Sequence, residues 1–190
     1  PEFGDADFSW TEYVRRNNDE LVATYGNLVH RVLHLIHRNF DGRVPEVGNL
    51  DGADQDMIYR SDQALESVGA SFEACRFREA VQRFMTLARE TNRYLDRQAP
   101  WKQVLANRMD AGKTLYTALY AISALSVITA PILPFTSERL WRMLGFNGTI
   151  ADNGWVVRPP EPGVSLPVPA PLFAKLDDSV AFNESAKLGH

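Results

Sequence analysis

The chain has 190 residues, of which 45% are hydrophobic and 23% are charged, and its formal net charge at pH 7 is −4. This composition predicts one globular domain with a substantial core and at most a short appendage, and it excludes disorder over most of the chain. The acidic balance excludes an indiscriminate nucleic-acid binder, which would normally be basic, but it leaves room for a small basic site.

The N-terminal stretch and the cysteine content indicate the cellular compartment. Residues 1–9 are expected to be a lead-in, with residues 1–3 a vector remnant, because the stretch is acidic and lacks the apolar run of a signal peptide. The single cysteine, Cys75, excludes an internal disulfide and a cysteine-based zinc site, and it suits a reducing compartment. A cytoplasmic location is therefore expected.

Helical periodicity dominates the chain up to about residue 146, and no earlier run alternates with the period of a strand. Over residues 10–40, apolar side chains recur at spacings of three and four, and Gly26 marks a place where another element approaches closely. Pro100 and Pro131 interrupt the pattern, and Thr136 is the expected N-cap of the last short helix. The predicted helices span residues 10–40, 54–75, 77–96, 101–107, 110–130 and 136–144.

The remainder of the chain is rich in proline. Six of the eleven prolines lie between Pro159 and Pro171, a density that predicts an extended strap without a core of its own. Residues 114–137 carry no formal charge and are long enough to span a membrane, but their prolines and hydroxyl groups favour a buried bundle helix. The predicted fold class is therefore all-α, an antiparallel bundle of about five helices over residues 10–146 with an extended tail over residues 147–190.

Two local patterns suggest nucleotide or metal binding but are incomplete. Gly112–Thr114 resembles the end of a phosphate-binding loop, yet Asn107 replaces the required glycine and no strand precedes it. Lys113 is instead expected to be solvated in the first turn of a helix. Three of the four histidines lie at metal-binding spacing on the first helix, namely His30, His34 and His37. No second ligand cluster accompanies them, so we expect no cofactor and no metal, and a histidine metal site is kept as an alternative.

The first helix also carries a cationic stripe opposite its apolar face. At about 100° per residue, a stripe about 60° wide contains Asn27, Arg31, His34 and Arg38. Such a stripe is usually a solvated face, but arginine and asparagine also present forked donors and acceptors that match phosphates and base edges.

Trp101 is the second candidate binding residue. It follows Pro100 at the break after the third helix, and proline narrows the direction in which the chain enters it. A tryptophan is most often a core anchor. An exposed ring near the cationic stripe would, however, provide a stacking surface for a base of single-stranded nucleic acid.

Four stretches of the chain form a recognisable set: Asn17–Arg31, Asn92–Lys102, Pro131–Trp141 and Leu166–Asp177. Together they resemble the anticodon-binding domain of methionyl-tRNA synthetases, which are class I aminoacyl-tRNA synthetases. The resemblance extends over residues 7–178, nearly the whole chain. Its most specific part is the Asn-x-Tyr and Ala-Pro-Trp pair of elements in Asn92–Lys102, because the Gly-Asn-Leu and Pro-x-Leu-Pro elements of the other stretches also occur in sister class I synthetases.

The resemblance implies an α-helix bundle that receives the anticodon loop of methionine tRNA. It assigns anticodon binding to Asn27, Arg31 and Trp101. The first anticodon base would stack on Trp101, and the other two residues would donate hydrogen bonds to anticodon bases. Auxiliary RNA contacts are expected from His34, Arg38 and Pro100. Ala23 stands where relatives often have a polar residue one turn earlier, which removes one contact.

The catalytic signatures of the full enzyme, which resemble His-Ile-Gly-His and Lys-Met-Ser-Lys-Ser, do not occur in the chain. The resemblance therefore implies a C-terminal segment that recognises tRNA for ATP-dependent aminoacylation, while ATP and Mg²⁺ bind elsewhere in the parent enzyme. The expected partners are methionine tRNA and the parent's catalytic domain, with no DNA and no membrane. Two alternatives stay open: the equivalent domain of a valyl-, isoleucyl-, leucyl- or cysteinyl-tRNA synthetase, and a helical protein-interaction module whose tail docks on a partner.

Overall fold

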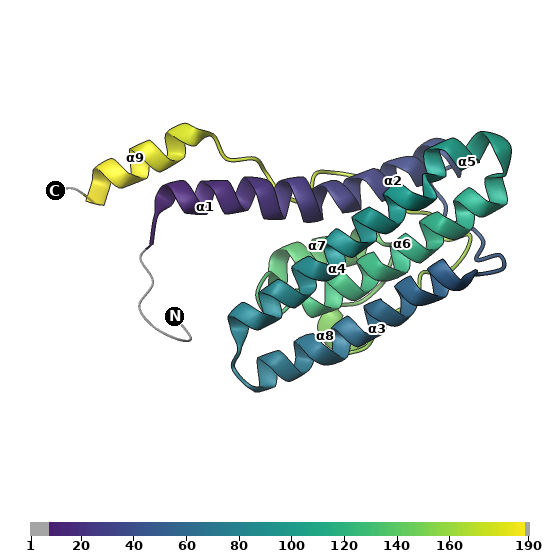
Figure 1. Cartoon of the computed structure of the whole chain (residues 1–190), viewed down its shortest axis with the longest axis horizontal. Coiled ribbons are helices and arrows are strands. Elements are labelled where there is room, and N and C mark those ends of the chain that lie inside the picture. Colours follow the sequence, from purple (N-terminus) through teal and green to yellow (C-terminus); the bar gives the residue numbers. More distant parts are fainter. Residues whose placement is uncertain (1–7, 189–190) are drawn as a thin grey trace.

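The computed structural model describes residues 8–188, which form a helical bundle with a projecting arm (Figure 1). The predicted lead-in at 1–9 lies mostly outside the described residues, as does the vector remnant at 1–3. The described residues form no strand, and one isolated antiparallel bridge joins Arg43 to Ser165, so the all-α prediction is confirmed. The elements are α1 (Trp10–Arg16), η1 (Asn17–Gly26), α2 (Asn27–Asn39), α3 (Gly52–Glu73), α4 (Phe77–Gln98), α5 (Pro100–Ala106), α6 (Arg108–Ile128), α7 (Pro134–Met143), α8 (Ile150–Asn153) and α9 (Asp178–Leu188).

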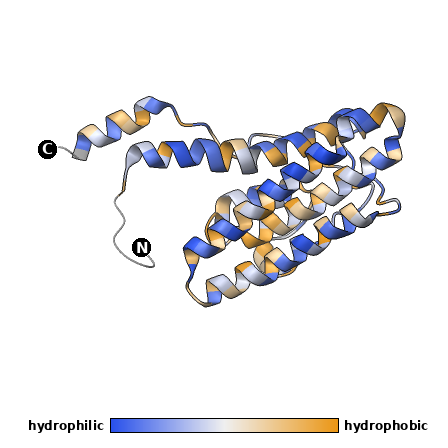
Figure 2. Ribbon diagram, in the orientation of Figure 1, coloured by the Kyte–Doolittle hydropathy of each residue, from blue (hydrophilic) through white to orange (hydrophobic). Residues whose placement is uncertain are grey.

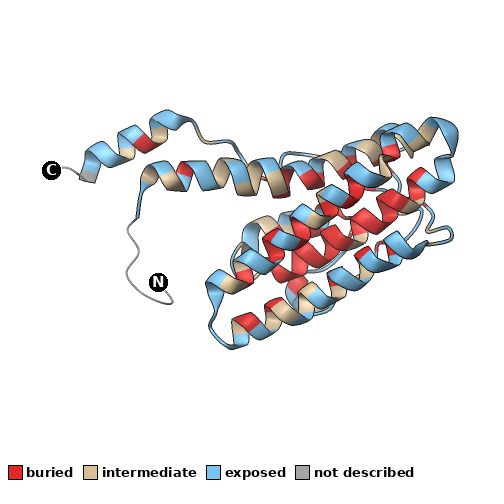
Figure 3. Cartoon of the chain, viewed as in Figure 1, coloured by how far each residue is buried: buried red, intermediate tan, exposed pale blue. Residues whose placement is uncertain are grey.

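Helix α6 forms the centre of the bundle. Nearly all of its residues from Ala111 onward are buried, and the buried faces of the surrounding helices point toward it (Figure 3). The helix is long and apolar enough to cross a membrane, but 89% of its most apolar window is buried inside the protein. The outer helices alternate between hydrophobic and hydrophilic residues along their lengths (Figure 2), as expected of helices with one face in the core.

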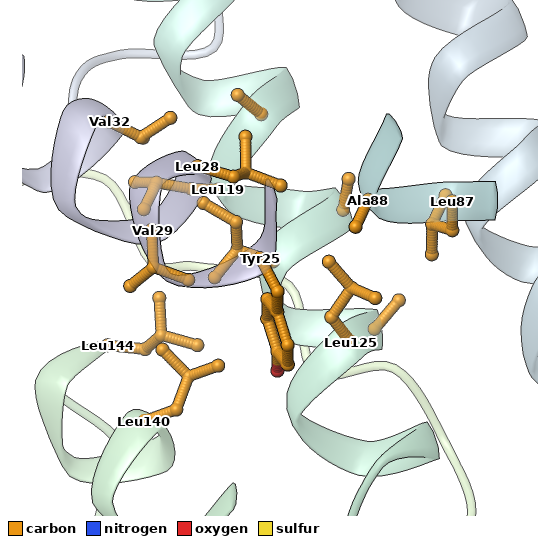
Figure 4. Packing of buried hydrophobic residues seen from close by; sticks show 14 of the residues in the cluster. Tyr25, Leu28, Val29, Val32, Leu87, Ala88, Leu119, Leu125, Leu140 and Leu144 are labelled. Carbon is orange, nitrogen blue, oxygen red and sulfur yellow. The ribbon is translucent and has the colours of Figure 1, made fainter. Parts of the chain in front are cut away.

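The apolar face of η1 and α2 packs into this core. The side chains that meet in the close view (Figure 4) include Tyr25, Leu28, Val29, Leu119, Leu125, Leu140 and Leu144. Full burial of one such side chain contributes about 2 kcal/mol to the free energy of unfolding. Because this face is committed to the core, the opposite face of α2, which carries Asn27 and Arg31, must lie toward solvent.

The first predicted helix is not a uniform α-helix. Its middle part, η1, is a ten-residue π-helix between α1 and α2, in which the carbonyl oxygen of Asp19 accepts a hydrogen bond of 2.9 Å from Thr24 Oγ1. The first four residues of η1 are polar, so the segment has too few apolar positions for the pattern to reveal the wider turn. The expectation for Gly26 is confirmed, because a Cβ there would lie 3.2 Å from Cδ2 of Phe173 in the tail.

The prediction that residues 147–190 form a continuous extended strap is wrong, because two helices lie within them. Residues 155–177 contain no helix, and Leu166 and Leu172 in this part are buried against the bundle. Helix α8 comes before them, and α9 after them packs along α1. Helix α9 forms because the prolines end at Pro171 and the Oδ1 of Asp177 accepts a hydrogen bond of 2.9 Å from the Ser179 amide at its start.

Several helices begin earlier than predicted. Helix α7 starts at Pro134 with Leu133 as its N-cap, so the expectation that Thr136 caps this helix is wrong. The physical reason is that the first helical position needs no amide donor and suits the fixed φ of proline. Helix α6 starts at Arg108, where the Oδ1 of Asn107 accepts a hydrogen bond of 3.1 Å from the Met109 amide.

Candidate functional site

The junction between α4 and α5 directs Trp101 outward. Ala99 adopts a left-handed conformation with φ of 47°, and its amide donates to the carbonyl oxygen of Leu95 at 2.8 Å, which closes α4. Pro100 then occupies the first turn of α5 and is buried. A left-handed alanine costs about 1 kcal/mol, so the surrounding packing must hold this turn. Trp101 follows with 37% of its surface exposed, and it is therefore not a core anchor.

Arg31 lies over the exposed tryptophan. Its guanidinium carbon is 4.5 Å from the centroid of the Trp101 ring, and its Nη2 donates to the Oδ1 of Asp96 at 2.6 Å. The Arg31 side chain is 27% exposed, whereas that of Asp96 is 62% exposed. We call Asn27, Arg31 and Trp101 the platform. Arg31 and Trp101, the two predicted site residues that lie far apart in the sequence, are thus in direct contact.

Asn27 begins α2, one turn before Arg31. Its amide donates to carbonyl oxygens of Thr24 and Val22, so the register of η1 sets its position. Asn27 is exposed, and within the described part of the chain its side chain makes no hydrogen bond. The platform therefore presents an aromatic ring, a guanidinium and an amide on one surface, which can stack on a planar ring and pair with its edge.

The other predicted contacts differ in accessibility. His34 and Arg38 are exposed further along α2, in line with the platform. The His30 and His34 rings stack at 5.9 Å, whereas His37 turns to the tail and hydrogen-bonds the carbonyl oxygen of Pro167 at 2.8 Å. Among residues 8–188 there is no group of three histidines, cysteines or carboxylates that could hold a metal. Pro100 is buried, which leaves it little surface for direct contact.

Asp96 is the site residue that sequence reasoning missed. In the structure, Asn92 lies one turn earlier on the same face of α4 and donates to the Thr24 carbonyl oxygen at 3.1 Å. This contact turns the face that carries Asp96 toward η1 and α2. Both members of the pair are charged, so the contact orients Arg31 while leaving some of its five N–H donors for a ligand.

A second carboxylate cluster lies below the same end of α4. Asp54 is fully buried, accepts a hydrogen bond from the Tyr94 hydroxyl, and lies 3.2 Å from Lys113 Nζ. Lys113 also donates to Asp51 at 2.8 Å, which raises the pKa of Lys113 and lowers that of Asp51. Burial, followed by the bond to Asp54, raises the pKa of Tyr94. The expectation of a solvated Lys113 is wrong, because its side chain is 13% exposed between two carboxylates.

Comparisons with known proteins cover both parts of the platform. A family model described as the anticodon binding domain of methionyl tRNA ligase matches residues 44–188, which include Trp101. A second model, described as tRNA synthetases class I (M), matches residues 1–33, which include Asn27 and Arg31. The platform thus joins side chains from the two matched segments.

Individual relatives agree with the family models. The methionine–tRNA ligase of Dehalococcoides mccartyi is 48% identical over 189 residues, covering 100% of this chain and 34% of the relative. That of Thermomicrobium roseum is 40% identical, covering 99% and 37%. The apo methionyl-tRNA synthetase of Mycobacterium tuberculosis superposes with a TM-score of 0.84 at 26% identity, over 92% of this chain and 36% of that one. The chain spans about a third of the length of the curated relatives it matches.

Proposed function

Because the chain belongs to the anticodon-binding domains of methionyl-tRNA ligases, we propose that it binds the CAU anticodon loop of methionine tRNA through the platform. The observation that supports this most directly is the exposed Trp101 with the Arg31 guanidinium over its ring at 4.5 Å. An unstacked base extends this stack, and base–aromatic stacking contributes about 1–3 kcal/mol.

Arg31 and Asn27 supply the polar part of recognition. Arg31 uses one Nη to bind Asp96, and its remaining donors reach a base edge beside the tryptophan. Asn27 offers one acceptor and two donors a turn away, a pattern that an amide can match to adenine or to a pyrimidine edge. His34 and Arg38 continue the same exposed face and favour neighbouring phosphates.

Attachment of methionine to the tRNA belongs to the parent enzyme, whose catalytic domain is the second partner. The described residues do not fit an ATP site at Gly112–Thr114, because this stretch lies inside α6 and Lys113 is paired with Asp51 and Asp54. We propose that ATP and Mg²⁺ bind elsewhere in the parent enzyme. The arm formed by α1 and α9 projects from the bundle and carries exposed aromatic side chains, among them Tyr13 and Phe182, which suits contact with that domain.

The decisive experiment measures binding of an anticodon stem-loop hairpin with a CAU loop to the chain and its variants. Trp101→Ala should cost about 1–3 kcal/mol of binding free energy. Arg31→Ala should weaken binding and relax base choice, whereas Arg38→Ala should weaken all hairpins uniformly, as a lost phosphate contact does. Phe135→Ala is a matched control, since Phe135 is 90% exposed on α7 and away from the platform.

Three outcomes would overturn the proposal. If Trp101→Ala and Arg31→Ala fold normally and bind the CAU hairpin as tightly as the parent chain, the platform is not the binding site. If the parent chain prefers a valine, isoleucine, leucine or cysteine anticodon, the methionine assignment fails. Absence of any RNA effect on the amide or tryptophan signals would favour the protein-interaction alternative.

A further inference from the structure

The outer face of α4 carries a second cationic feature that lies apart from the platform. Arg89, Arg93 and Arg97 follow one another at four-residue spacing, and all three are exposed. Their Cα atoms are about 6 Å apart along the helix axis, so the row is about 12 Å long. We call these three residues the α4 arginine row.

The row is not neutralised by neighbouring acids. All three acidic residues of α4 already have arginine partners, in the pairs Arg83–Glu79, Arg60–Glu90 and Arg31–Asp96. Among the described residues no carboxylate lies within 4.0 Å of the row. Arg89 donates to Thr86 Oγ1 at 3.0 Å and Arg97 to the Arg93 carbonyl oxygen at 3.3 Å, and both acceptors are uncharged. Asp56 and Glu90 line the same pocket as Arg93 and Arg97, but within the described part of the chain no guanidinium of the row is held in an ion pair, so all three can bind a ligand.

The row leads directly to the platform. Asp96, which binds Arg31, is next to Arg97, and Trp101 follows Arg97 by four residues. Figure 1 shows α4 running along the bundle and ending beside α5 and α2. A ligand whose tip sits on Trp101 can thus extend over Arg97, Arg93 and Arg89 in order.

We propose that the α4 arginine row binds the phosphate backbone of the anticodon stem, and this inference rests on the proposed binding of the loop to the platform. Guanidinium groups bind phosphates in a bidentate manner, and a row of them about 6 Å apart follows a strand backbone without reading its bases. Since the whole chain carries a net charge of −4, such a local row attracts the stem without making the surface generally adhesive.

The test measures how tightly the parent chain and its variants bind hairpins that share one stem and differ in the loop. The triple variant Arg89→Gln, Arg93→Gln, Arg97→Gln should bind every hairpin about tenfold more weakly at moderate salt. The slope of log affinity against log salt should shrink by about 2–3, since each of the three lost contacts removes somewhat less than one unit. The ratio of affinities for CAU and other loops should stay unchanged, because phosphate contacts carry no sequence information.

Two control variants separate charge placement from total charge. Arg83→Gln lies on the same helix but is paired with Glu79, so it should leave affinity and salt slope close to those of the parent chain. Replacing all three row residues by lysine keeps the charge and should restore most of the salt slope. Each row residue is exposed, so the glutamine variant should keep the parent's circular dichroism and unfolding midpoint.

The results distinguish this inference from the proposed function. If Trp101→Ala weakens CAU binding but the triple glutamine variant keeps the parent's affinity and salt slope, the row is not an RNA contact while the platform stands. An equal loss of affinity in Arg83→Gln, or a loss of affinity for only one loop sequence, also contradicts the proposed role of the row. If Trp101→Ala has no effect on any hairpin, the platform fails, and the row's proposed role fails with it.

Discussion

Tyr94 and Asp96 are two residues apart on α4, yet they belong to two carboxylate clusters with opposite exposure. On one face of α4, Tyr94 binds Asp54, which is fully buried and also binds Lys113 of α6. On the other face, Asp96 binds Arg31 and is 62% exposed. Both clusters pair a carboxylate with a cation and tie the same end of α4 to a neighbouring helix, so the chemistry is similar and the solvent access differs.

The difference in solvent access gives the two clusters different roles, one in stability and one in ligand binding. Loss of one partner of a buried ion pair costs several kcal/mol, because the remaining charge cannot recover its hydration. An exposed pair contributes about 0–1 kcal/mol, since water replaces either partner at little cost. The Asp54 cluster therefore holds α3, α4 and α6 together beneath the platform. The Asp96 pair can open or rearrange when a ligand arrives.

The largest expected effect comes from Asp54→Asn. The change keeps the shape of the side chain but removes the charge that Lys113 and Tyr94 share, and it weakens the reciprocal cap with Asp51 at the start of α3. We expect the free energy of unfolding to fall by about 3 kcal/mol in urea denaturation at neutral pH. A fall below about 1 kcal/mol would show that the buried cluster does not hold this end of the bundle.

The next effect concerns Tyr94 and alkaline pH. Burial and the bond to Asp54 raise the pKa of Tyr94 above its usual value of 10.0. The hydrogen bond to Asp51 likewise raises the pKa of Lys113. A raised pKa contributes stability that is complete below the unfolded pKa and is lost as pH rises above it. The free energy of unfolding should therefore fall above about pH 10, by up to about 1.4 kcal/mol per pH unit for each such group.

Tyr94→Phe isolates this contribution. It should lower the free energy of unfolding by about 2 kcal/mol at neutral pH, because Asp54 loses a hydrogen-bond donor. Above pH 10 the decline with pH should be less steep than in the parent chain. Some decline should remain, since burial also raises the pKa of Tyr25 and Tyr120. Urea denaturation between pH 7 and pH 11 measures both effects, and an unchanged slope would contradict the assignment.

The sequence predicted the helices of the bundle because most of them have one apolar face, which periodicity detects directly. It did not predict the π-helical turns of η1, because the first four residues of that segment are polar and the few apolar ones that follow do not define a period. It also missed α9, because proline content was averaged over the tail although the prolines end at Pro171. The local absence of proline after residue 171, rather than the average over the tail, permits the helix α9.

The candidate site was predictable where it depends on one helix. The angular stripe on the first helix placed Asn27 and Arg31 on an exposed face, as the structure shows. The contact of Arg31 with Asp96 and the burial of Lys113 depend on the packing of separate helices, to which no local pattern corresponds. His37 likewise turns to the tail because Pro167, 130 residues later, offers it a carbonyl oxygen.

The smallest expected effect on stability is that of Asp96→Asn, the same substitution as in the buried cluster. The asparagine carbonyl can still accept from Arg31, and water reaches both groups, so the free energy of unfolding should change by less than about 1 kcal/mol. Removal of a negative charge beside the platform should tighten binding of any hairpin by about twofold at moderate salt. Urea denaturation and hairpin titration of this variant, beside Asp54→Asn, compare one chemical change at two levels of solvent access. A loss of about 3 kcal/mol at both positions would mean that solvent access does not separate the two clusters, and Arg31 would then be too firmly held to exchange partners.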